Sequence, residues 1–348
     1  MTHPTNISKR GFLQATAAAG ALAATGQGIA QQGPLRFHQM LPAQATIPSR
    51  AIAPWIAKVE KESGGRLKIQ QFNAMALGGT PTQLFDQARD GVADITWTVL
   101  GYTAGRFNRC EVFELPFMTS GAETSSRAFQ EYVEKNAMEE FKDVKLICVH
   151  THGAGLFHTK EPVTNMEDLR GMKIRGGSRV ISNMLTKLGA TPVGMPVPAV
   201  TDALSKGTIQ GTTIPWEVTP ALKVTELVKN HTTFAGKQGL YTQTFAVSMN
   251  KAAYEKLPAD LKKVIDDNSG MAAAAMFGKA MDEGDAIGLD IARKAGNRII
   301  ALDIAETQRW KRTASTVETD WIKEMQGKGI DGPKLIAEAR AAIDKYSK

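Results

Sequence analysis

The sequence predicts an α/β protein with two lobes, and three observations support this fold class. First, 348 residues correspond to about two domains at roughly 150 residues each. Second, 43% hydrophobic, 22% charged and 7% aromatic residues are typical of globular proteins and exclude a wholly disordered, collagen-like or coiled-coil chain. Third, helix and strand patterns alternate in two blocks, an order that favours mostly parallel sheets covered by helices on both faces.

The first block of elements runs from residue 35 to residue 99. Apolar positions recur at helical spacing within Ser49–Ser63, and Gly64 and Gly65 end the pattern. Thr80 is typical of a helix cap and Pro81 of a first helical position, so a second helix begins there. Apolar runs predict three strands, at Leu35–Gln39, Arg66–Phe72 and Val92–Val99.

The second block continues the alternation after a strand at Val144–Val149. Further strands are predicted at Met172–Arg175, Thr191–Met195 and Thr208–Ile214, and helices at Ser178–Leu188 and Val200–Lys206.

A long helical pattern then runs from Pro258 to Ala295, and helical patterns resume at Ala305–Met325 and Gly332–Tyr346. The long pattern contains four glycines, at positions 270, 278, 284 and 288. Each weakens a helix by roughly 1 kcal/mol relative to alanine, so we expect bends or close packing at these positions.

The charged residues and the cysteines limit the classes of function. The formal net charge is +7, from 42 Lys and Arg against 35 Asp and Glu, and no run of five or more basic residues occurs. A dilute positive charge favours solubility or the steering of small anions over a nucleic-acid partner. The two cysteines, Cys110 and Cys148, are too few for a disulfide scaffold or a four-cysteine metal site, and whether they pair stays open.

Residues 1–30 have the pattern of a cleaved export signal. Lys9 and Arg10 precede an alanine-rich apolar stretch, and small residues predict cleavage after Ala30. The stretch is far shorter than the ~20 residues that span a bilayer, so we expect no membrane anchor. Ser8–Leu13 resembles a twin-arginine signal with lysine in place of the first arginine, which leaves Tat and Sec export both open. Either route predicts a periplasmic protein.

Enzyme motifs are sparse in this chain. Gly153 and Gly155 begin a dinucleotide-type loop, but His158 stands where the third glycine belongs, and no phosphate-binding or nucleophile-elbow motif occurs. Cys148, His150 and His152 share one face of a predicted strand, a pattern that a zinc site can use. An exported metal-dependent enzyme is therefore the alternative hypothesis for function.

A stronger pattern surrounds Arg175, at the carboxyl end of a predicted strand and just before a helix. In open α/β sheets ligands bind at such strand ends. The turn Gly176–Gly177 permits close backbone approach, and the amides of the helix start favour an anion. The guanidinium matches a carboxylate with two hydrogen bonds. Arg179 lies in the first helical turn, where a cation is unfavourable, and this predicts a negative charge nearby.

These residues belong to a longer family pattern. Met166–Pro192 resembles the signature of solute-binding proteins of tripartite ATP-independent periplasmic (TRAP) transporters, of the DctP type. The likeness continues through Ala203–Gly211, Ile214–Val228 and Val247–Pro258, and Glu114–Phe117 resembles an earlier family segment. The match spans residues 34–348.

The resemblance implies a periplasmic binding protein of two lobes with a long helix spanning both, rather than an enzyme. It predicts one lobe from residues 33–157 plus 240–280 and the other from 158–239 plus 281–348. It also implies that a small carboxylate ligand is delivered to the membrane permease subunits of a sodium-driven TRAP transporter.

The resemblance further implies a set of ligand-binding residues. Arg175 takes the position of the family's carboxylate-binding arginine, and Lys160 stands where sialic-acid-binding relatives have a second arginine. Positions that are polar in those relatives are apolar here, which favours a small or apolar monocarboxylate, aromatic or branched, over a sugar acid. They are Val99, Val197 and Ile214.

Three more side chains complete the candidate ligand site: Trp97, Trp216 and His152. Some relatives with a Trp-Glu pair at the position of Trp216 and Glu217 bind a metal ion beside the ligand carboxylate. We expect no obligatory cofactor, with a bridging metal at this pair as the remaining possibility.

Overall fold

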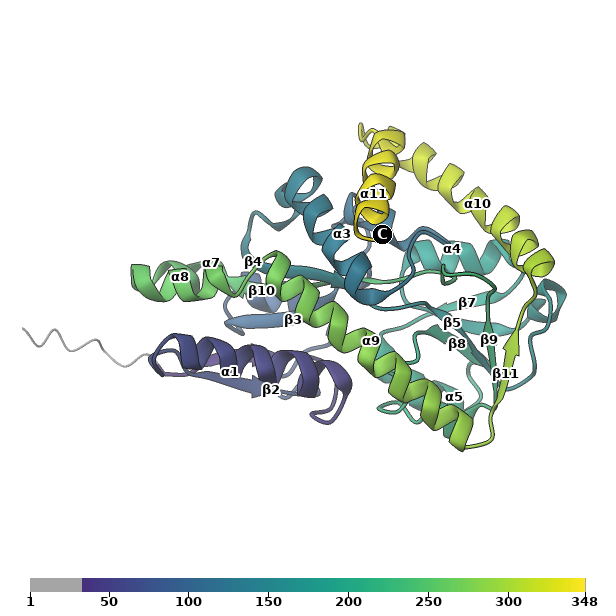
Figure 1. Cartoon of the computed structure of the whole chain (residues 1–348), viewed down its shortest axis with the longest axis horizontal. Coiled ribbons are helices and arrows are strands. Elements are labelled where there is room, and N and C mark those ends of the chain that lie inside the picture. The colour runs from purple at the N-terminus through teal and green to yellow at the C-terminus, as the bar shows by residue number, and fades with distance from the viewer. Residues whose placement is uncertain (1–32, 348) are drawn as a thin grey trace, which may run out of the picture. The chain divides into compact units, whose positions relative to one another are not determined.

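Two mixed sheets organise residues 33–347, the part of the chain that the computed structural model describes (Figure 1). The first sheet has the strand order β2-β1-β3-β10-β4, in which β1 runs parallel to β2 and β3, and β10 runs antiparallel to β3 and β4. Its strands are β1 (Leu35–His38), β2 (Ile69–Phe72), β3 (Ile95–Val99), β4 (Val144–Thr151) and β10 (Thr244–Asn250). The predicted leader at residues 1–30 lies outside the described residues.

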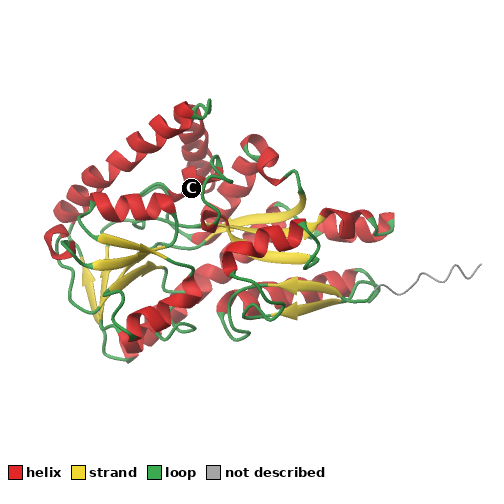
Figure 2. Cartoon of the chain, turned by 180° about the vertical axis from the view of Figure 1, so that it is seen from behind, coloured by secondary structure: helices red, strands yellow, loops and turns green. Residues whose placement is uncertain are grey.

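The second sheet has six strands in the order β11-β9-β5-β8-β6-β7. They are β5 (Leu156–Thr159), β6 (Lys173–Gly176), β7 (Thr191–Gly194), β8 (Gly211–Ile214), β9 (Asn230–Thr233) and β11 (Arg298–Ala301). β6 is parallel to β7 and β8, β9 is parallel to β11, and β5 is antiparallel to β8 and β9. Figure 2 shows the same two groups of strands from behind, with the helices around them.

The predicted α/β class is confirmed, and the expectation of mostly parallel sheets needs a correction. β5 and β10 were not predicted, and each runs antiparallel to both of its neighbours. Both strands carry the chain from one sheet to the other without an intervening helix, since β5 follows β4 and β10 follows β9 directly.

The helices form mainly where apolar positions recur at helical spacing. A short π-helical turn, Ile47–Ile52, leads into α1, and Thr80 and Gln83 form a capping box at the 3₁₀ turn Pro81–Gln83 that precedes α2. The α-helices are α1 (Ala53–Glu62), α2 (Leu84–Arg89), α3 (Ala122–Asn136), α4 (Arg179–Lys187), α5 (Val200–Ser205), α6 (Val224–Leu227), α7 (Lys251–Glu255), α8 (Ala259–Asp267), α9 (Met271–Lys294), α10 (Ile304–Gly327) and α11 (Gly332–Tyr346).

The long helical pattern of residues 258–295 forms two helices, α8 and α9. The break falls at Gly270, whose φ of +63° is a left-handed value that glycine adopts without strain. α9 then runs from α3 and β4 of the first sheet to the loop after β8 of the second (Figure 1). This is the predicted long helix that spans both lobes.

The other three glycines of α9 allow close packing rather than bends. An added Cβ would lie 2.7 Å from the carbonyl oxygen of Ala122 at Gly278, 2.6 Å from Cγ of Glu217 at Gly284, and 2.1 Å from the carbonyl oxygen of Trp216 at Gly288. The segment Trp216–Glu217 therefore rests directly on the α9 backbone.

The C-terminal helices contact both halves of the fold. α10 packs on α4 beside the second sheet, and α11 packs on α3, which covers β4 of the first sheet. The exact lobe boundaries stay a prediction. None of the helices between residues 33 and 347 is both long enough and apolar enough to cross a membrane.

Candidate functional site

A cavity lies between the two sheets, with about 380 Å³ of empty space when the solvent at its opening is included. β3, β10 and their flanking loops line it from the first sheet, and β6, β8 and the loop after β8 line it from the second. The lining residues are Leu41, Trp97, Val99, Tyr102, His152, Arg175, Val197, Ile214, Pro215, Glu217, Val218, Gln243, Phe245 and Met281. The sequence predicted five of the ligand-site candidates in this lining, together with Val99.

Arg175 is the one buried cation of this cavity. It lies on β6, and its side chain is 0% exposed. Its guanidinium donates to the carbonyl oxygens of Met195 (3.0 Å) and Thr213 (3.4 Å). Among the described residues, no carboxylate forms an ion pair with Arg175, although burial of a charge is costly unless the charge is paired. The geometry therefore suits an anionic ligand.

Tyr102 extends the arginine site across the cavity. It ends a 3₁₀ turn, Leu100–Tyr102, that directly follows β3 of the first sheet. Its hydroxyl oxygen accepts from the backbone N–H of Val197, in the 3₁₀ turn Val197–Ala199 after β7, at 2.7 Å, and from Nη2 of Arg175 on β6 at 3.4 Å. The hydroxyl hydrogen remains available to a ligand. The sequence analysis missed Tyr102, although it stands only three residues after Val99.

Gln243 adds a second donor that the sequence analysis missed. Its side chain is 4% exposed and lies against Gly177, where an added Cβ would come within 2.2 Å of the amide oxygen. The amide nitrogen has no hydrogen-bond partner among the described residues. The close approach expected for the Gly176–Gly177 turn thus brings Gln243 near the arginine strand.

Trp97 and Phe245 form an aromatic wall. Their rings stack with centroids 5.2 Å apart and planes 5° apart, and His150 stacks on Phe245 at 4.8 Å. The indole N–H of Trp97 donates to Nε2 of His150 at 2.8 Å. Because this bond satisfies the polar atom of Trp97, the ring is left as an apolar surface for a ligand.

His152 lines the cavity as a neutral ring. Burial, reinforced by the nearby charge of Arg175, lowers the pKa of His152 to about 3. Nδ1 lies 2.6 Å from the carbonyl oxygen of Gly153, which assigns the proton to Nδ1, and Nε2 accepts from the Gln243 backbone N–H at 3.1 Å. Both nitrogens are thus engaged with the backbone, so His152 offers shape rather than a hydrogen bond.

The predicted zinc site at Cys148, His150 and His152, on which the alternative hypothesis rested, is not formed in the described part of the chain. Within residues 33–347 no group of three metal-ligating side chains is suitably placed. His150 accepts from Trp97 and His152 is held by the backbone, as described above, while Cys148 is buried in the apolar core and burial raises the pKa of its thiol. Cys110 and Cys148 are both free, so they do not pair.

Two predicted ligand residues lie outside the cavity lining. Trp216 packs against His158 and His231, with ring centroids 5.0 and 4.8 Å apart, behind the loop that follows β8. Lys160 is exposed just after β5. Trp216 is buried but packs away from the cavity, whereas its sequence neighbours Pro215 and Glu217 line it.

Glu217 is a buried carboxyl group in the cavity lining. Its side chain is 4% exposed, and its backbone N–H donates to Oδ1 of Asp285 on α9 at 2.7 Å. Burial, and secondarily the charge of Asp285, raises the pKa of Glu217 to about 8. The bridging metal that the resemblance left possible at Trp216–Glu217 would need the ligand carboxylate as a further ligand, and it stays a prediction.

Glu217 should make folding stability depend on pH. A carboxyl whose pKa is raised in the folded state stabilises the fold fully below its unfolded pKa, near 4.5, and this contribution is lost as pH rises toward 8. Glu217→Gln has no titrating group at this position. Its free energy of unfolding should therefore rise relative to that of wild type by about 1.4 kcal/mol for each unit of pH increase within this window. Urea unfolding of both proteins at pH 5, 6, 7 and 8 measures the difference, and parallel pH profiles would contradict it.

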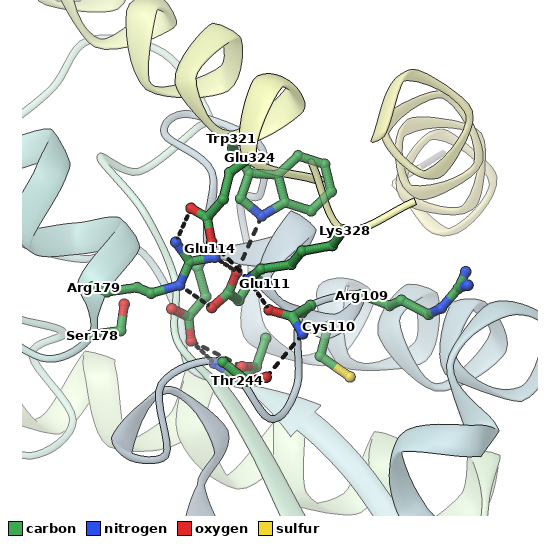
Figure 3. Close-up of polar contacts among 12 residues, drawn as sticks. Arg109, Cys110, Glu111, Glu114, Ser178, Arg179, Thr244, Trp321, Glu324 and Lys328 are labelled. Atoms are coloured by element: carbon green, nitrogen blue, oxygen red, sulfur yellow. Dashed lines mark hydrogen bonds and ion pairs between the residues drawn. The ribbon is translucent and has the colours of Figure 1, made fainter. Parts of the chain in front are cut away.

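The negative charge predicted near Arg179 is confirmed, since Glu111 and Glu324 both bond its guanidinium (Figure 3). Arg179 begins α4, and its Nε donates to Glu111 Oε1 at 2.6 Å, while Nη1 bonds Glu324 of α10. Trp321 also donates its indole N–H to Glu111, at 3.2 Å. Since Glu111 lies in the 3₁₀ turn Cys110–Glu114, the network ties this turn to α4 and α10.

Two sheets joined by a spanning helix, with a cavity lined from both and a buried unpaired arginine inside it, define a solute-binding protein of the two-lobed class. Residues 37–324 match the family model described as bacterial extracellular solute-binding protein, family 7, or DctP. The chain belongs to this family, and its relatives are TRAP solute-binding proteins.

Solved structures and a curated relative extend this match. The chain is 49% identical to a TRAP solute-binding protein from Rhodoferax ferrireducens in complex with copurified benzoate, with a TM-score of 0.88 over 90% of this chain and 98% of that one. It is 48% identical to a marine metagenome TRAP solute-binding protein specific for aromatic acid ligands, in complex with 3-hydroxybenzoate, with a TM-score of 0.89 over 90% and 98%. A solute-binding protein of Albidiferax ferrireducens is 26% identical over 90% of this chain and 93% of its own length.

Proposed function

We propose that this protein captures an aromatic monocarboxylate in the periplasm and delivers it to the membrane subunits of a TRAP transporter. The observation that carries the proposal is Arg175, a fully buried guanidinium without a carboxylate partner among the described residues. A ligand carboxylate supplies the missing charge, and Tyr102 and Gln243 offer further donors beside it.

The rest of the cavity favours an aromatic ring over a polyhydroxylated chain. Trp97 and Phe245 provide a stacked wall, and the aliphatic side chains of Val99, Val197 and Ile214 lie in the same lining. A sugar acid would leave its hydroxyl groups without partners against these surfaces, at a desolvation cost for each. The aromatic acids bound by the two similar structures agree with this choice.

Benzoate and benzamide give a direct test, because they share shape and differ in charge. At a hundredfold excess over its Kd, benzoate should stabilise the protein by about 2.7 kcal/mol, whereas benzamide at the same concentration should leave the melting temperature unchanged. Thermal unfolding with each compound, followed by calorimetric titration, measures both. Stabilisation by neutral sugars or cationic amines, with none by monocarboxylates, would contradict the proposal.

Delivery to a permease needs a separate experiment. Proteoliposomes that contain the cognate TRAP membrane subunits should accumulate labelled benzoate only with this protein outside and with a sodium gradient. Equal uptake without the protein would show that it is not the transport partner. Secretion of a chain that lacks residues 1–30 would argue against the leader on which the periplasmic location depends.

A further inference from the structure

One polar group of the cavity has no role in binding a carboxylate. Glu217 lies in the same lining as Arg175, yet the two do not form an ion pair. A carboxyl group would repel a ligand carboxylate if it were ionised, so its presence in an anion site requires another explanation.

The position of Glu217 is set by close packing rather than by chance. Its Cγ rests on Gly284 of α9, where a Cβ would come within 2.6 Å, and the hydroxyl of Thr46 reaches its backbone carbonyl at 3.4 Å. The side chain is 96% buried, and its Oε1 has no hydrogen-bond partner among the described residues. A buried polar atom without a partner costs free energy, and such atoms in native proteins are nearly always satisfied.

The neighbours of Glu217 in the cavity do not supply that partner. Pro215, Val218 and Met281 are apolar, and Leu41 faces them from the first sheet. Outside the lining, the hydroxyl of Thr46 also lies beside the Glu217 carboxyl. Oε1 is nevertheless left without a partner among the described residues, and a polar group of the ligand can supply one. A hydroxyl group fits either state of the carboxyl, since it can donate to a carboxylate oxygen or accept from a protonated one.

We propose that Glu217 forms a hydroxyl subsite, which makes this protein prefer hydroxylated aromatic monocarboxylates over the unsubstituted acid. The inference rests on the proposed function and narrows its substrate class. Arg175 holds the carboxylate, and Glu217 meets the ring hydroxyl elsewhere in the same cavity.

Calorimetric titration of benzoate and its 2-, 3- and 4-hydroxy derivatives tests the subsite. At least one hydroxybenzoate should bind wild type roughly three- to tenfold tighter than benzoate, the gain of one buried hydrogen bond. Glu217→Met, of similar length but apolar, should abolish this preference, so that it binds benzoate and the three hydroxybenzoates with affinities within about threefold of one another. Glu217→Gln, which can still donate and accept, should retain the preference.

A matched control and three contrary outcomes make the test decisive. Met281→Leu changes the same lining without a polar atom, so it should shift the affinities of all four acids equally. The subsite is overturned if wild type binds all four acids alike, or if Glu217→Met keeps the preference. It is also overturned if cationic 3-(aminomethyl)benzoate binds tighter than every hydroxybenzoate, because Glu217 would then recognise an ammonium group. If no aromatic acid binds, the proposed function fails as well.

Discussion

Arg175→Met should weaken aromatic carboxylate binding by about thirty- to several-thousand-fold. The ligand's carboxylate would be buried without its countercharge, and truncation of one partner of a buried charge pair costs roughly 2–5 kcal/mol. Calorimetric titration with benzoate measures the loss. Arg175→Lys keeps the positive charge but loses the planar guanidinium, so its affinity for benzoate should lie between those of Arg175→Met and wild type.

The stability of the ligand-free variant separates a binding role from a structural one. In wild type the guanidinium is buried without an anion, and the side chain is 0% exposed. Replacing an unpaired buried charge with an apolar group of similar length should leave the melting temperature of the free protein unchanged or higher. Addition of benzoate should then no longer raise the melting temperature of Arg175→Met. Benzoate affinity within threefold of wild type would refute the assignment of Arg175 as the anchor.

The sequence predicted Arg175 because the features that place it are local. A strand, a Gly-Gly turn and a capped helix follow one another within residues 173–187, and the structure has β6, Ser178 as the N-cap and α4 in that order. The Thr80 cap was predictable for the same reason, since Thr80, Pro81 and Gln83 act within one turn. Resemblance to the family extended this local pattern to a role.

The remaining cavity residues are brought together by long-range pairing, which a local pattern does not reveal. Phe245 lies in β10, and β10 inserts between β3 and β4 from a segment about 90 residues further along the chain than β4. Tyr102 is aimed at Arg175 only because a 3₁₀ turn follows β3. The position of Trp216 outside the cavity lining shows the same limit, since the side on which a loop residue points depends on what it packs against.

The metal hypothesis failed for a related reason. Alternation along a strand places residues two apart on one face, but His152 follows the last residue of β4, Thr151, so the alternation no longer applies to it. His150 is also committed to Trp97 of β3. Shared parity along the strand thus did not produce a set of metal ligands within the described residues.

Gly288→Ala should cause the largest loss of stability among single-methyl changes in α9. The added Cβ would lie 2.1 Å from the Trp216 carbonyl oxygen and 2.7 Å from its carbonyl carbon, both backbone atoms that cannot rotate away. Overpacking of this kind costs about 1–3 kcal/mol, which lowers the melting temperature by roughly 2–5 °C in a chain of this size. The loop Ile214–Val218 forms part of the cavity, so its displacement should also weaken benzoate binding.

Gly327→Ala is the matched control, because Gly327 ends the equally long helix α10 and an added Cβ there has nothing within 4 Å. Alanine has the higher helix propensity, so this variant should be neutral or up to about 1 kcal/mol more stable than wild type, with benzoate affinity unchanged. Scanning calorimetry of both variants with and without benzoate makes the comparison. Equal melting temperatures for the two would mean that Trp216 does not rest on the α9 backbone, and the support of Glu217 by this helix would then lose its basis.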